Sequence, residues 1–294
     1  RHLWNPADYP SPDHVLDRIA AGDSSIVIGT SHGMQADDTD LESLESIGFD
    51  NTPELQALLD NPTIRTILIP KGKYLFKKSS AGNYGIQIPA NKVLMGLSTS
   101  LTELRTHDDW NPTAEVPLVT TVNDADADPK MAFLKLGFTI DPLANDWFAT
   151  VDLRAGKYSM TRNIYPRGIW ANRASTQARA DMIFSGNAGG RHYAIGGGPA
   201  YAHDALPYAP GGTGNYRRIR ITNTTQPLHF YNLNVEDGQD KYQGEAVNCQ
   251  NVVIYGIKSE DPNGFEFRNS TNCALLNYGG RAEVEVDNCN DILI

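Results

Sequence analysis

The 294-residue sequence lacks several features that mark common classes of protein. It has no apolar run near the ~18 residues that span a bilayer, so we expect no membrane insertion. It has only three cysteines and no C-x-x-C pair, which excludes the usual zinc and redox motifs. It also has no initial methionine and no apolar leader, so we expect either a processed, secreted and extracellular product or a fragment.

Positive charge is also in deficit, because 25 Lys and Arg residues face 35 Asp and Glu residues. The imbalance lies at the start of the chain, where residues 1–62 hold twelve acidic residues but only Arg1 and Arg18. No part of the sequence offers the basic stripe that phosphate neutralisation requires. Nucleic acid and anionic membrane surfaces are therefore not expected partners.

What the chain does contain is a repeat with a period of 24 residues. The stretches 226–237 and 250–261 share Gln, Tyr, Glu and Asp at matching places, and their apolar positions also coincide. The match extends from Asn248-Cys249 to Asn272-Cys273. A period of this length predicts coils that stack to bury their apolar faces, and the alternation within each coil indicates strands.

The entry to the repeats resembles a known family. Residues 50–60 followed by 66–74 are similar to the first coil of the pectate-lyase-like right-handed β-helix proteins, in which a short helix precedes a Pro-x-Gly-x-Tyr turn. Residues 251–260 are similar to their later coils, so the resemblance covers about 50–100 and 217–294. It implies an all-β fold, a right-handed single-stranded parallel β-helix (a solenoid) with a short N-terminal helical cap. The superfamily includes polysaccharide lyases, glycoside hydrolases and non-catalytic phage or adhesin coils, and the ordered polygalacturonase motifs are not found here.

The domain organisation follows from this pattern. We expect residues 1–50 to form an acidic lead-in or cap and 50–294 to form one β-helix domain that continues beyond residue 294. A helix is predicted over 52–59, because Pro53 stands at its first position and three leucines share one face. The region 142–216 is poorly periodic and predicts coils interrupted by long loops.

A doubled Glu-Asp pair is the strongest catalytic candidate in the sequence. With a 24-residue coil, Glu236 lies over Glu260 and Asp237 over Asp261, about 4.8 Å apart. Glycosidases need one protonated and one ionised carboxyl beside the scissile bond, whereas lyases need a base and a cation that neutralises a uronate. Carboxylates outnumber bases on this facet, which favours a hydrolase over a lyase acting on a polysaccharide. The alternative is a solvated acidic ladder at a coil corner.

Several residues near these coils are candidates for substrate binding, each with a structural alternative. Arg268 shares a strand face with Glu266, and the two would otherwise form a surface ion pair. Tyr231 and Tyr255 stack on successive coils as a sugar platform or as packing. Two further candidates are Lys258, beside the acidic pair, and His203, in the long loop 196–212.

Metal binding is suggested at one place only. The alternation of Asp124, Asp126 and Asp128 predicts a calcium loop, although Pro129 and Lys135 stand where an EF-hand requires Gly and Glu. The other expectation is that the protein has no cofactor. Oligomeric state is not predicted.

Two other functions fit parts of the sequence. A non-catalytic β-solenoid, such as an adhesin, spike or fibre component, would use the acidic ladder for solvation alone. A serine hydrolase is suggested by Ser31 within the G-x-S-x-G pattern at 29–33, although too few strands precede it. The cysteines Cys249, Cys273 and Cys289 follow asparagines in related contexts, which predicts buried thiols rather than a disulfide framework.

Overall fold

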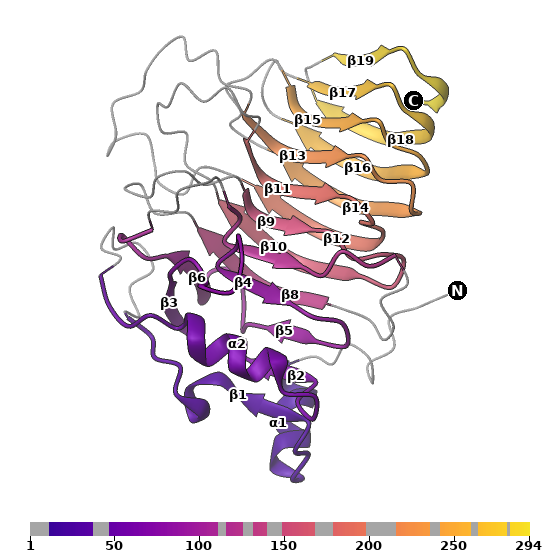
Figure 1. Ribbon diagram of the computed structural model, residues 1–294. Coiled ribbons are helices and arrows are strands. Elements are labelled where there is room, and N and C mark those ends of the chain that lie inside the picture. Colours follow the sequence, from indigo (N-terminus) through magenta and orange to yellow (C-terminus); the bar gives the residue numbers. More distant parts are fainter. Residues whose placement is uncertain are drawn as a thin grey trace.

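The chain forms a stack of parallel β coils with two short helices at one end (Figure 1). The computed structural model describes residues 12–37, 47–110, 116–125, 132–139, 149–167, 179–197, 216–235, 242–259, 264–280 and 283–294. Seven predicted site residues lie outside these ranges: Glu236, Asp237, Glu260, Asp261, His203, Asp126 and Asp128.

Two parallel sheets build the described part of the solenoid. Sheet A contains twelve strands, with the path β1-β2-β5-β8-β10-β12-β14-β16-β18-β20 and with β3 and β6 joined beside it. Its strands are β1 (Ile26–Ile28), β2 (Thr66–Leu68), β3 (Gly72–Phe76), β5 (Val93–Met95), β6 (Thr102–Thr106), β8 (Ala132–Thr139), β10 (Met160–Arg167), β12 (Gly190–Gly197), β14 (Leu228–Val235), β16 (Val252–Ser259), β18 (Thr271–Gly280) and β20 (Asn290–Leu293).

Sheet B contains eight strands in chain order along the stack. They are β4 (Ile86–Ile88), β7 (Val119–Thr121), β9 (Ala149–Leu153), β11 (Arg179–Ser185), β13 (Tyr216–Thr222), β15 (Tyr242–Val247), β17 (Gly264–Arg268) and β19 (Val284–Asp287). Every pairing in both sheets is parallel, and crossover connections between parallel strands are right-handed. The right-handed parallel β-helix predicted from the sequence is confirmed.

The 24-residue period holds for one pair of coils and then changes. Leu228 pairs with Val252 and Tyr231 with Tyr255, as the repeat predicts. In the next coil Val253 pairs with Ala274, 21 residues further on. The predicted overlay of Asn248-Cys249 on Asn272-Cys273 is therefore wrong, because the second coil is shorter than the first.

The cysteines align differently from the prediction but are free thiols. The N–H of Cys249 donates to Ser270 Oγ at 3.1 Å, and Gln250 pairs with Thr271, so Cys249 is aligned with Ser270 on the next coil. Cys249 and Cys273 are buried and Cys289 is partly buried. Burial raises the pKa of Cys249 to about 12, which makes its thiol unreactive.

Asparagines mark the turn that leaves sheet B. Asn223, Asn248, Asn269 and Asn288 all have φ between 49° and 56°, a left-handed conformation that Asn tolerates better than most residues. Their amides also bond between coils: Asn248 Nδ2 donates to Asn223 Oδ1 at 3.1 Å. These turns hold successive coils in register.

Helix α2 (Thr52–Asp60) packs beside β4 at the first coils, with Pro53 in its first turn and Leu55, Leu58 and Leu59 buried. The predicted helical cap is confirmed. At the same end, helix α1 (Pro12–Ala20) contributes Val15 to a cluster on the outer side of sheet A. None of the helices in the described ranges is long and apolar enough to cross a membrane.

The segment before residue 50 includes a strand and a short helical turn. Strand β1 pairs with β2, so residues 26–28 already extend sheet A. The 3₁₀ helix η1 (Gly29–His32) follows β1 directly and places Ser31 on the surface. A nucleophile elbow needs a strand of a doubly covered sheet that turns sharply into an α-helix, so the predicted serine-hydrolase site at Ser31 is wrong.

Candidate functional site

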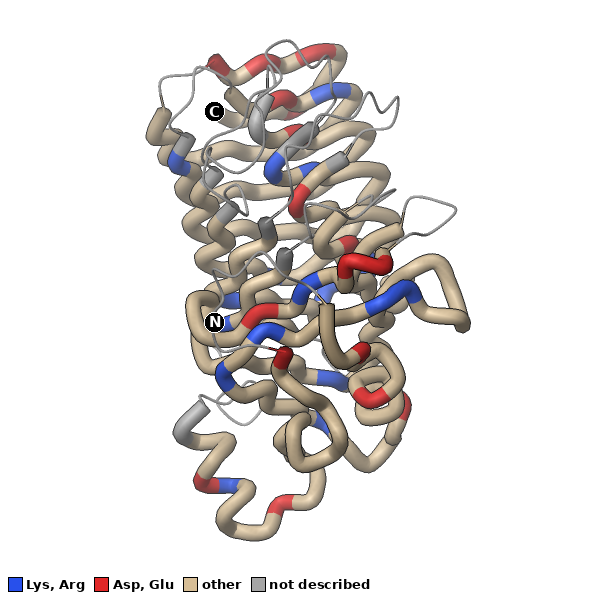
Figure 2. The backbone as a smooth tube through the Cα atoms, turned by 90° about the vertical axis from the view of Figure 1, so that its left-hand side faces the viewer, with Lys and Arg blue, Asp and Glu red and all other residues tan. Residues whose placement is uncertain are grey.

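The outward side of sheet B carries charged residues on successive coils. We call this surface the charged face and define it by Asp152, Arg154, Asp181, Arg218, Arg220, Glu245, Glu266 and Arg268. Along each strand the residues alternate between the core and the outside, and Val151 and Leu153 lie in the core on either side of Asp152. Strand pairing then connects Asp152 to one residue on each following coil, all on the outward side of the sheet: Ile183, Arg220, Glu245 and Glu266. Figure 2 shows charged positions of both signs recurring on successive coils of the stack.

The charged face is buried although it points away from the core. Asp152 is 8 % exposed, Glu245 1 % and Glu266 6 %. Removing a charge from water costs several kcal/mol unless a partner compensates. The recurrence of buried charges along successive coils makes this face the candidate site.

An ion pair without exposed surface anchors the middle of the charged face. Arg218 Nη1 lies 2.9 Å from Asp181 Oδ2, and both side chains are 0 % exposed. The pair joins β11 to β13. Asp181 is therefore closed to solvent.

Asp152 is the group on this face that titrates near neutrality. Its desolvation by burial raises its pKa to about 6, against the smaller opposing effects of a hydrogen bond from Ser185 and the charge of Arg154. Ser185 Oγ donates to Asp152 Oδ1 at 2.8 Å, which fixes the carboxyl on its strand. A carboxyl with such a pKa can exchange a proton with a substrate at neutral pH.

Arg154 stands next to this carboxyl with unused hydrogen-bonding capacity. It follows the last residue of β9, and its charge acts on the Asp152 carboxyl two residues earlier. Its Nε is buried and has no hydrogen-bond partner in the part of the chain that the structure describes. Asp152 and Arg154 together provide a proton acceptor and a cation that can receive an anionic group.

Glu245 and Glu266 form a second arrangement at the other end of the charged face. They pair across neighbouring strands, so their Cα atoms lie about 4.8 Å apart. Arg220 Nε lies 2.6 Å from Glu245 Oε1. Arg268 is 40 % exposed, and its Nη1 is 3.8 Å from Glu266 Oε1. The ion pair given as the structural alternative for these two residues is therefore present, with an exposed arginine and a glutamate whose side chain is only 8 % exposed.

The predicted tyrosine stack exists on the outer side of sheet A. The rings of Tyr193, Tyr231 and Tyr255 stack at 4.8 Å and 5.0 Å with interplanar angles of 11° and 7°. Each ring face is covered by the next ring, so the stack offers ring edges rather than a flat platform. Lys258 pairs with Asn234 on the same side, as predicted, and is exposed.

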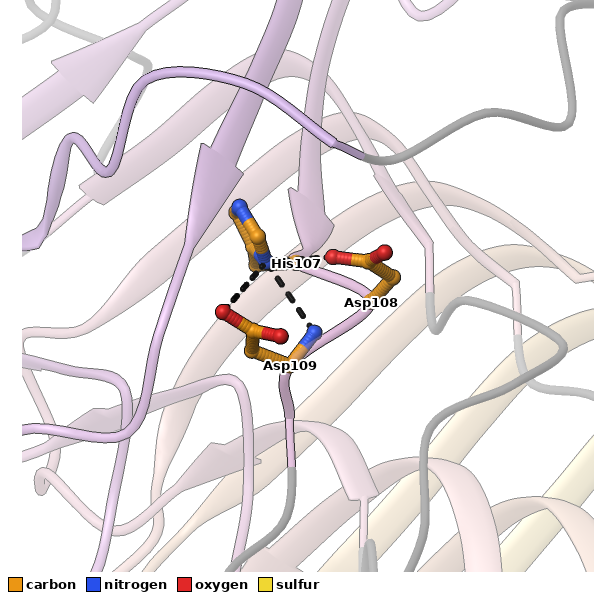
Figure 3. A group of neighbouring side chains, drawn as sticks. All are labelled: His107, Asp108 and Asp109. Carbon is orange, nitrogen blue, oxygen red and sulfur yellow. Dashed lines mark hydrogen bonds and ion pairs between the residues drawn. The ribbon is translucent and has the colours of Figure 1, made fainter.

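One cluster of potential metal ligands lies in the described ranges, at the end of β6. His107 Nδ1, Asp108 Oδ1 and Asp109 Oδ2 lie within 4.8 Å of one another (Figure 3). His107 Nδ1 accepts the N–H of Asp109 at 3.0 Å, and Lys77 Nζ lies 2.6 Å from Asp109 Oδ2. The Lys77 ammonium already neutralises Asp109, so a divalent cation would have to displace it.

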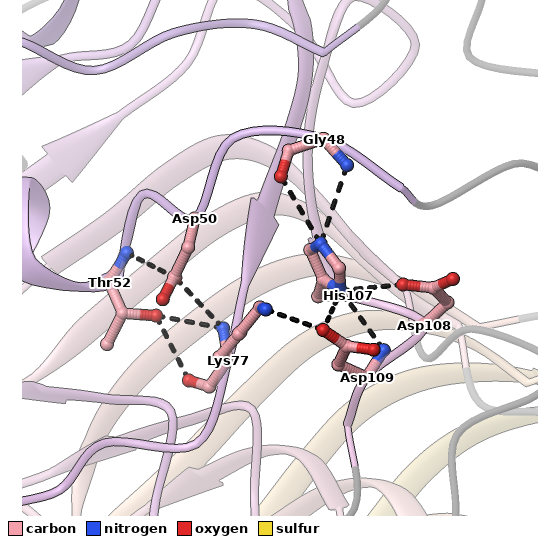
Figure 4. A network of polar contacts seen from close by, with 7 residues as sticks. All are labelled: Gly48, Asp50, Thr52, Lys77, His107, Asp108 and Asp109. Atoms are coloured by element: carbon pink, nitrogen blue, oxygen red, sulfur yellow. Dashed lines mark hydrogen bonds and ion pairs between the residues drawn. The ribbon is translucent and has the colours of Figure 1, made fainter.

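The same cluster ties the start of α2 to the first coils (Figure 4). His107 Nε2 lies 3.2 Å from the Gly48 carbonyl, and the Lys77 N–H donates to Thr52 Oγ1 at 2.9 Å. The Thr52 hydroxyl donates in turn to the Lys77 carbonyl at 3.0 Å. These contacts give the cluster a structural role. At the predicted calcium loop, Asp124 is exposed and its backbone carbonyl accepts the N–H of Gly156.

The charged face was not predicted from the sequence, apart from Glu266 and Arg268. Its members come from coils of unequal length, so no fixed spacing connects them. The available signal was local: single charges between apolar residues in short strands, as in 149–153 and 180–184. An outward charge in such a strand looks like ordinary surface until its burial is known.

Comparison with known proteins gives similarity at low identity. No family model and no curated protein matches the chain. Among solved structures, ORF18 of Geobacillus virus E2 is 12 % identical with a TM-score of 0.40 over 99 % of this chain and 65 % of that one. The A-module of the mannuronan C-5 epimerase AlgE4 of Azotobacter vinelandii is 12 % identical with a TM-score of 0.41, over 90 % of this chain and 76 % of the module.

A catalytic domain of a GH87 α-1,3-glucanase is 13 % identical with a TM-score of 0.26, over 88 % of this chain and 67 % of that domain. At these values the similarities carry no information about the chemistry of this chain. Its architecture rests on its own strands and their parallel register. By that architecture the chain is a right-handed parallel β-helix.

Proposed function

We propose that this protein is a carbohydrate-active enzyme that cleaves a uronate-containing polysaccharide by β-elimination on the charged face. The observation that carries the proposal is the pair formed by Asp152 and Arg154. Asp152 has a pKa of about 6 and so is mostly ionised at neutral pH, as a base must be. Arg154 offers a buried guanidinium Nε without a partner in the described ranges.

Arg154 and Asp152 have separate roles in the proposed reaction. Arg154 binds the uronate carboxylate and stabilises the negative charge that develops on it when the neighbouring carbon loses its proton. The Asp152 carboxylate takes that proton, the electron pair forms a carbon–carbon double bond, and the glycosidic bond to the leaving oxygen breaks. The leaving oxygen takes a proton from solvent. The products are an unsaturated uronate and a new sugar end.

This assignment replaces the preference for a hydrolase that the sequence alone suggests. A hydrolase needs a second carboxyl within reach of the same sugar. The carboxyl diagonally across from Asp152 is Asp181, which has no exposed surface and is bound to Arg218. A base and a cation suffice for a lyase, and Asp152 and Arg154 supply both.

Glu245 and Glu266 favour a second candidate, a retaining glycoside hydrolase. Their Cα atoms are paired on neighbouring strands about 4.8 Å apart, a spacing that allows their carboxyls the ~5–5.5 Å separation of retaining enzymes. Arg220 Nε lies 2.6 Å from Glu245 Oε1, which assigns the nucleophile's part to Glu245. Glu266 would then act as the acid.

A panel of polysaccharides assayed both by reducing ends and by ultraviolet absorbance separates the two reactions. Elimination produces both signals, whereas hydrolysis produces reducing ends alone. We expect Asp152→Asn to abolish both signals on a uronate polymer and Glu245→Gln to leave them largely intact. Loss of reducing ends in Glu245→Gln and Glu266→Gln, with Asp152→Asn active, would support hydrolysis instead.

The carboxylates predicted from the repeat belong in the same assay. Glu236→Gln and Glu260→Gln test whether the acidic pair that follows β14 and β16 takes part in cleavage. Full activity in both would exclude Glu236 and Glu260 from the reaction. No product from any polysaccharide in the panel would favour the non-catalytic solenoid. Secretion, predicted from the sequence, remains part of this proposal.

A further inference from the structure

The outer side of sheet A carries a row of aromatic and cationic side chains away from the charged face. We call it the tyrosine face and define it by Arg162, Arg191, Tyr193, His229, Tyr231, Asn234, Tyr255 and Lys258. At the first coils this side of the sheet is covered by an apolar cluster that includes Val15 of α1 and Met160 at the start of β10. The tyrosine face extends from the edge of that cluster along β10, β12, β14 and β16.

The charge of the tyrosine face is opposite to that of the whole chain. The outward positions described on these four strands include Arg162, Arg191 and Lys258 but no Asp or Glu. The chain as a whole has a net charge of −10. Such local cationic character attracts an anionic ligand.

The tyrosines add a regular row of hydroxyl groups to this charge. Tyr193, Tyr231 and Tyr255 expose their edges at steps of 4.8 and 5.0 Å, comparable to one sugar residue in an extended polysaccharide. Arg162 pairs with Tyr193 in the register and so continues the row by one coil. The row spans about three sugar residues.

Two buried polar atoms on the tyrosine face lack partners. His229 Nδ1 and Asn234 Oδ1 have no hydrogen-bond partner in the described part of the chain. Buried polar atoms are normally satisfied, so each one without a partner calls for an explanation. Hydroxyl groups of a bound sugar would satisfy both an imidazole nitrogen and an amide oxygen.

From these observations we propose that the tyrosine face is a second glycan-binding surface, which holds an anionic polysaccharide along the solenoid axis away from the charged face. The substrate class rests on the proposed function, since the same uronate polymer would occupy both faces. A long polymer held at two places stays near the catalytic face between cleavage events, because the second contact is intramolecular. The proposal therefore also implies preference for long chains.

The test measures binding rather than turnover, so that it stands apart from the proposed reaction. In an Asp152→Asn background, the affinity for polygalacturonate is measured by affinity electrophoresis for Lys258→Glu and Arg191→Glu, with dextran as the neutral probe. We expect about a tenfold loss of affinity in each, and a smaller loss in Tyr231→Phe, which removes one hydroxyl but keeps the stacked ring. Added salt should weaken binding of the unmodified face.

Lys71→Glu is the matched control, because it makes the same charge change at an exposed position at the start of the solenoid. Equal affinity in Lys258→Glu, Arg191→Glu and Lys71→Glu would overturn the proposal. Equal binding of dextran and polygalacturonate would overturn the assignment to anionic chains. If Asp152→Asn kept its activity, the proposed reaction would fail, while the binding comparison would still decide the role of the tyrosine face.

Discussion

The side-chain amide of Gln56 is hydrogen-bonded to the backbone of Gln87 in the way that a neighbouring strand would be. The N–H of Gln87 donates to Gln56 Oε1 at 3.0 Å, and Gln56 Nε2 donates to the Gln87 carbonyl at 3.0 Å. Gln87 lies in β4, the end strand of sheet B, whose outer backbone groups have no further strand. A side chain from α2 thus satisfies the open edge of the solenoid, where unpaired backbone groups would invite pairing with another chain.

Replacing Gln56 with leucine should destabilise the protein by about 1–2 kcal/mol, because two hydrogen bonds to the strand edge are lost at about 1 kcal/mol each. Urea unfolding measures the change. Asp60→Ala is the control, since it removes the third bond of the same amide, Gln56 Nε2 to Asp60 Oδ1 at 2.9 Å, and leaves Gln87 paired. An equal loss of unfolding free energy in both variants would contradict a specific contribution from the two hydrogen bonds between Gln56 and Gln87.

The buried pair of Asp181 and Arg218 predicts an asymmetry between single and double replacement. Asp181→Leu or Arg218→Met alone should cost about 3–5 kcal/mol, because each removes the 2.9 Å ion-pair partner of a charge that has no exposed surface. The double variant Asp181→Leu, Arg218→Met should be far less destabilised than the sum of the two. A double-mutant cycle by urea unfolding measures this coupling, and additive losses would contradict it.

The repeat shows how far the sequence predicts this fold. Alternation and the matched tyrosines were enough to predict parallel coils and the pairing of Tyr231 with Tyr255. The same period failed at Asn248, because the next coil is 21 residues long: Asn248 follows β15, whereas Asn272 lies within β18. Strand spacing fixes the distance between coils but leaves loop length free, so one observed period cannot be extended to the next coil.

The candidate site was less predictable for a related reason. Asp152 and Arg220 are aligned across β9, β11 and β13 only because the loops between these strands bring them into register. Their spacing in sequence is set by those loops and carries no pattern. Burial, which separates a charged site from an ordinary surface, arises from the whole fold and is not encoded near either residue.

The asparagine turns allow two effects to be separated at one position. Asn248 has φ of 55° and donates to Asn223 across the coils. Asn248→Gly keeps the left-handed turn and loses the hydrogen bond, so we expect a loss of about 1 kcal/mol or less. Asn248→Ala loses both and should cost about 1 kcal/mol more. Thermal unfolding of the two variants measures the difference, and equal stability would exclude a role for backbone conformation.

His192 predicts sensitivity to acid. It lies in the core, 0 % exposed, between Thr161 Oγ1 at 3.0 Å and the Gly189 carbonyl at 3.0 Å. Burial lowers its pKa to about 3, so the folded protein keeps it neutral while the unfolded chain binds a proton below about pH 6.5. Stability should therefore fall as the pH drops through this range. Urea unfolding of the Thr161→Val, His192→Phe double variant should show a weaker fall, and an unchanged profile would contradict this cause.

The pKa of Asp152 predicts that stability falls as the pH rises, which is opposite to the effect of His192. The carboxyl proposed to act as the base would therefore lower the stability of the protein at neutral pH. Its pKa of about 6 in the folded protein exceeds the ordinary value of 3.8, so between these values the folded state holds a proton that the unfolded state releases. As the pH rises from about 4 to about 6, the Asp152 contribution should therefore lower the free energy of unfolding by up to about 3 kcal/mol, against the gain that His192 contributes over the same range. Asp152→Asn should remove this fall, since its amide oxygen still accepts the Ser185 hydroxyl, and should unfold at higher urea than the unmodified protein at pH 7.

The same carboxyl should control the activity profile. If Asp152 is the base, kcat/KM rises with pH through an apparent pKa near 6. Ser185→Ala removes a hydrogen bond that favours the ionised form, so it should move both the stability step and the rising limb to higher pH. An equal shift of the stability profile and of the kcat/KM profile would show that the Asp152 carboxyl controls both. A shift of the stability step alone would separate the buried carboxyl from catalysis and assign the proton transfer to another residue.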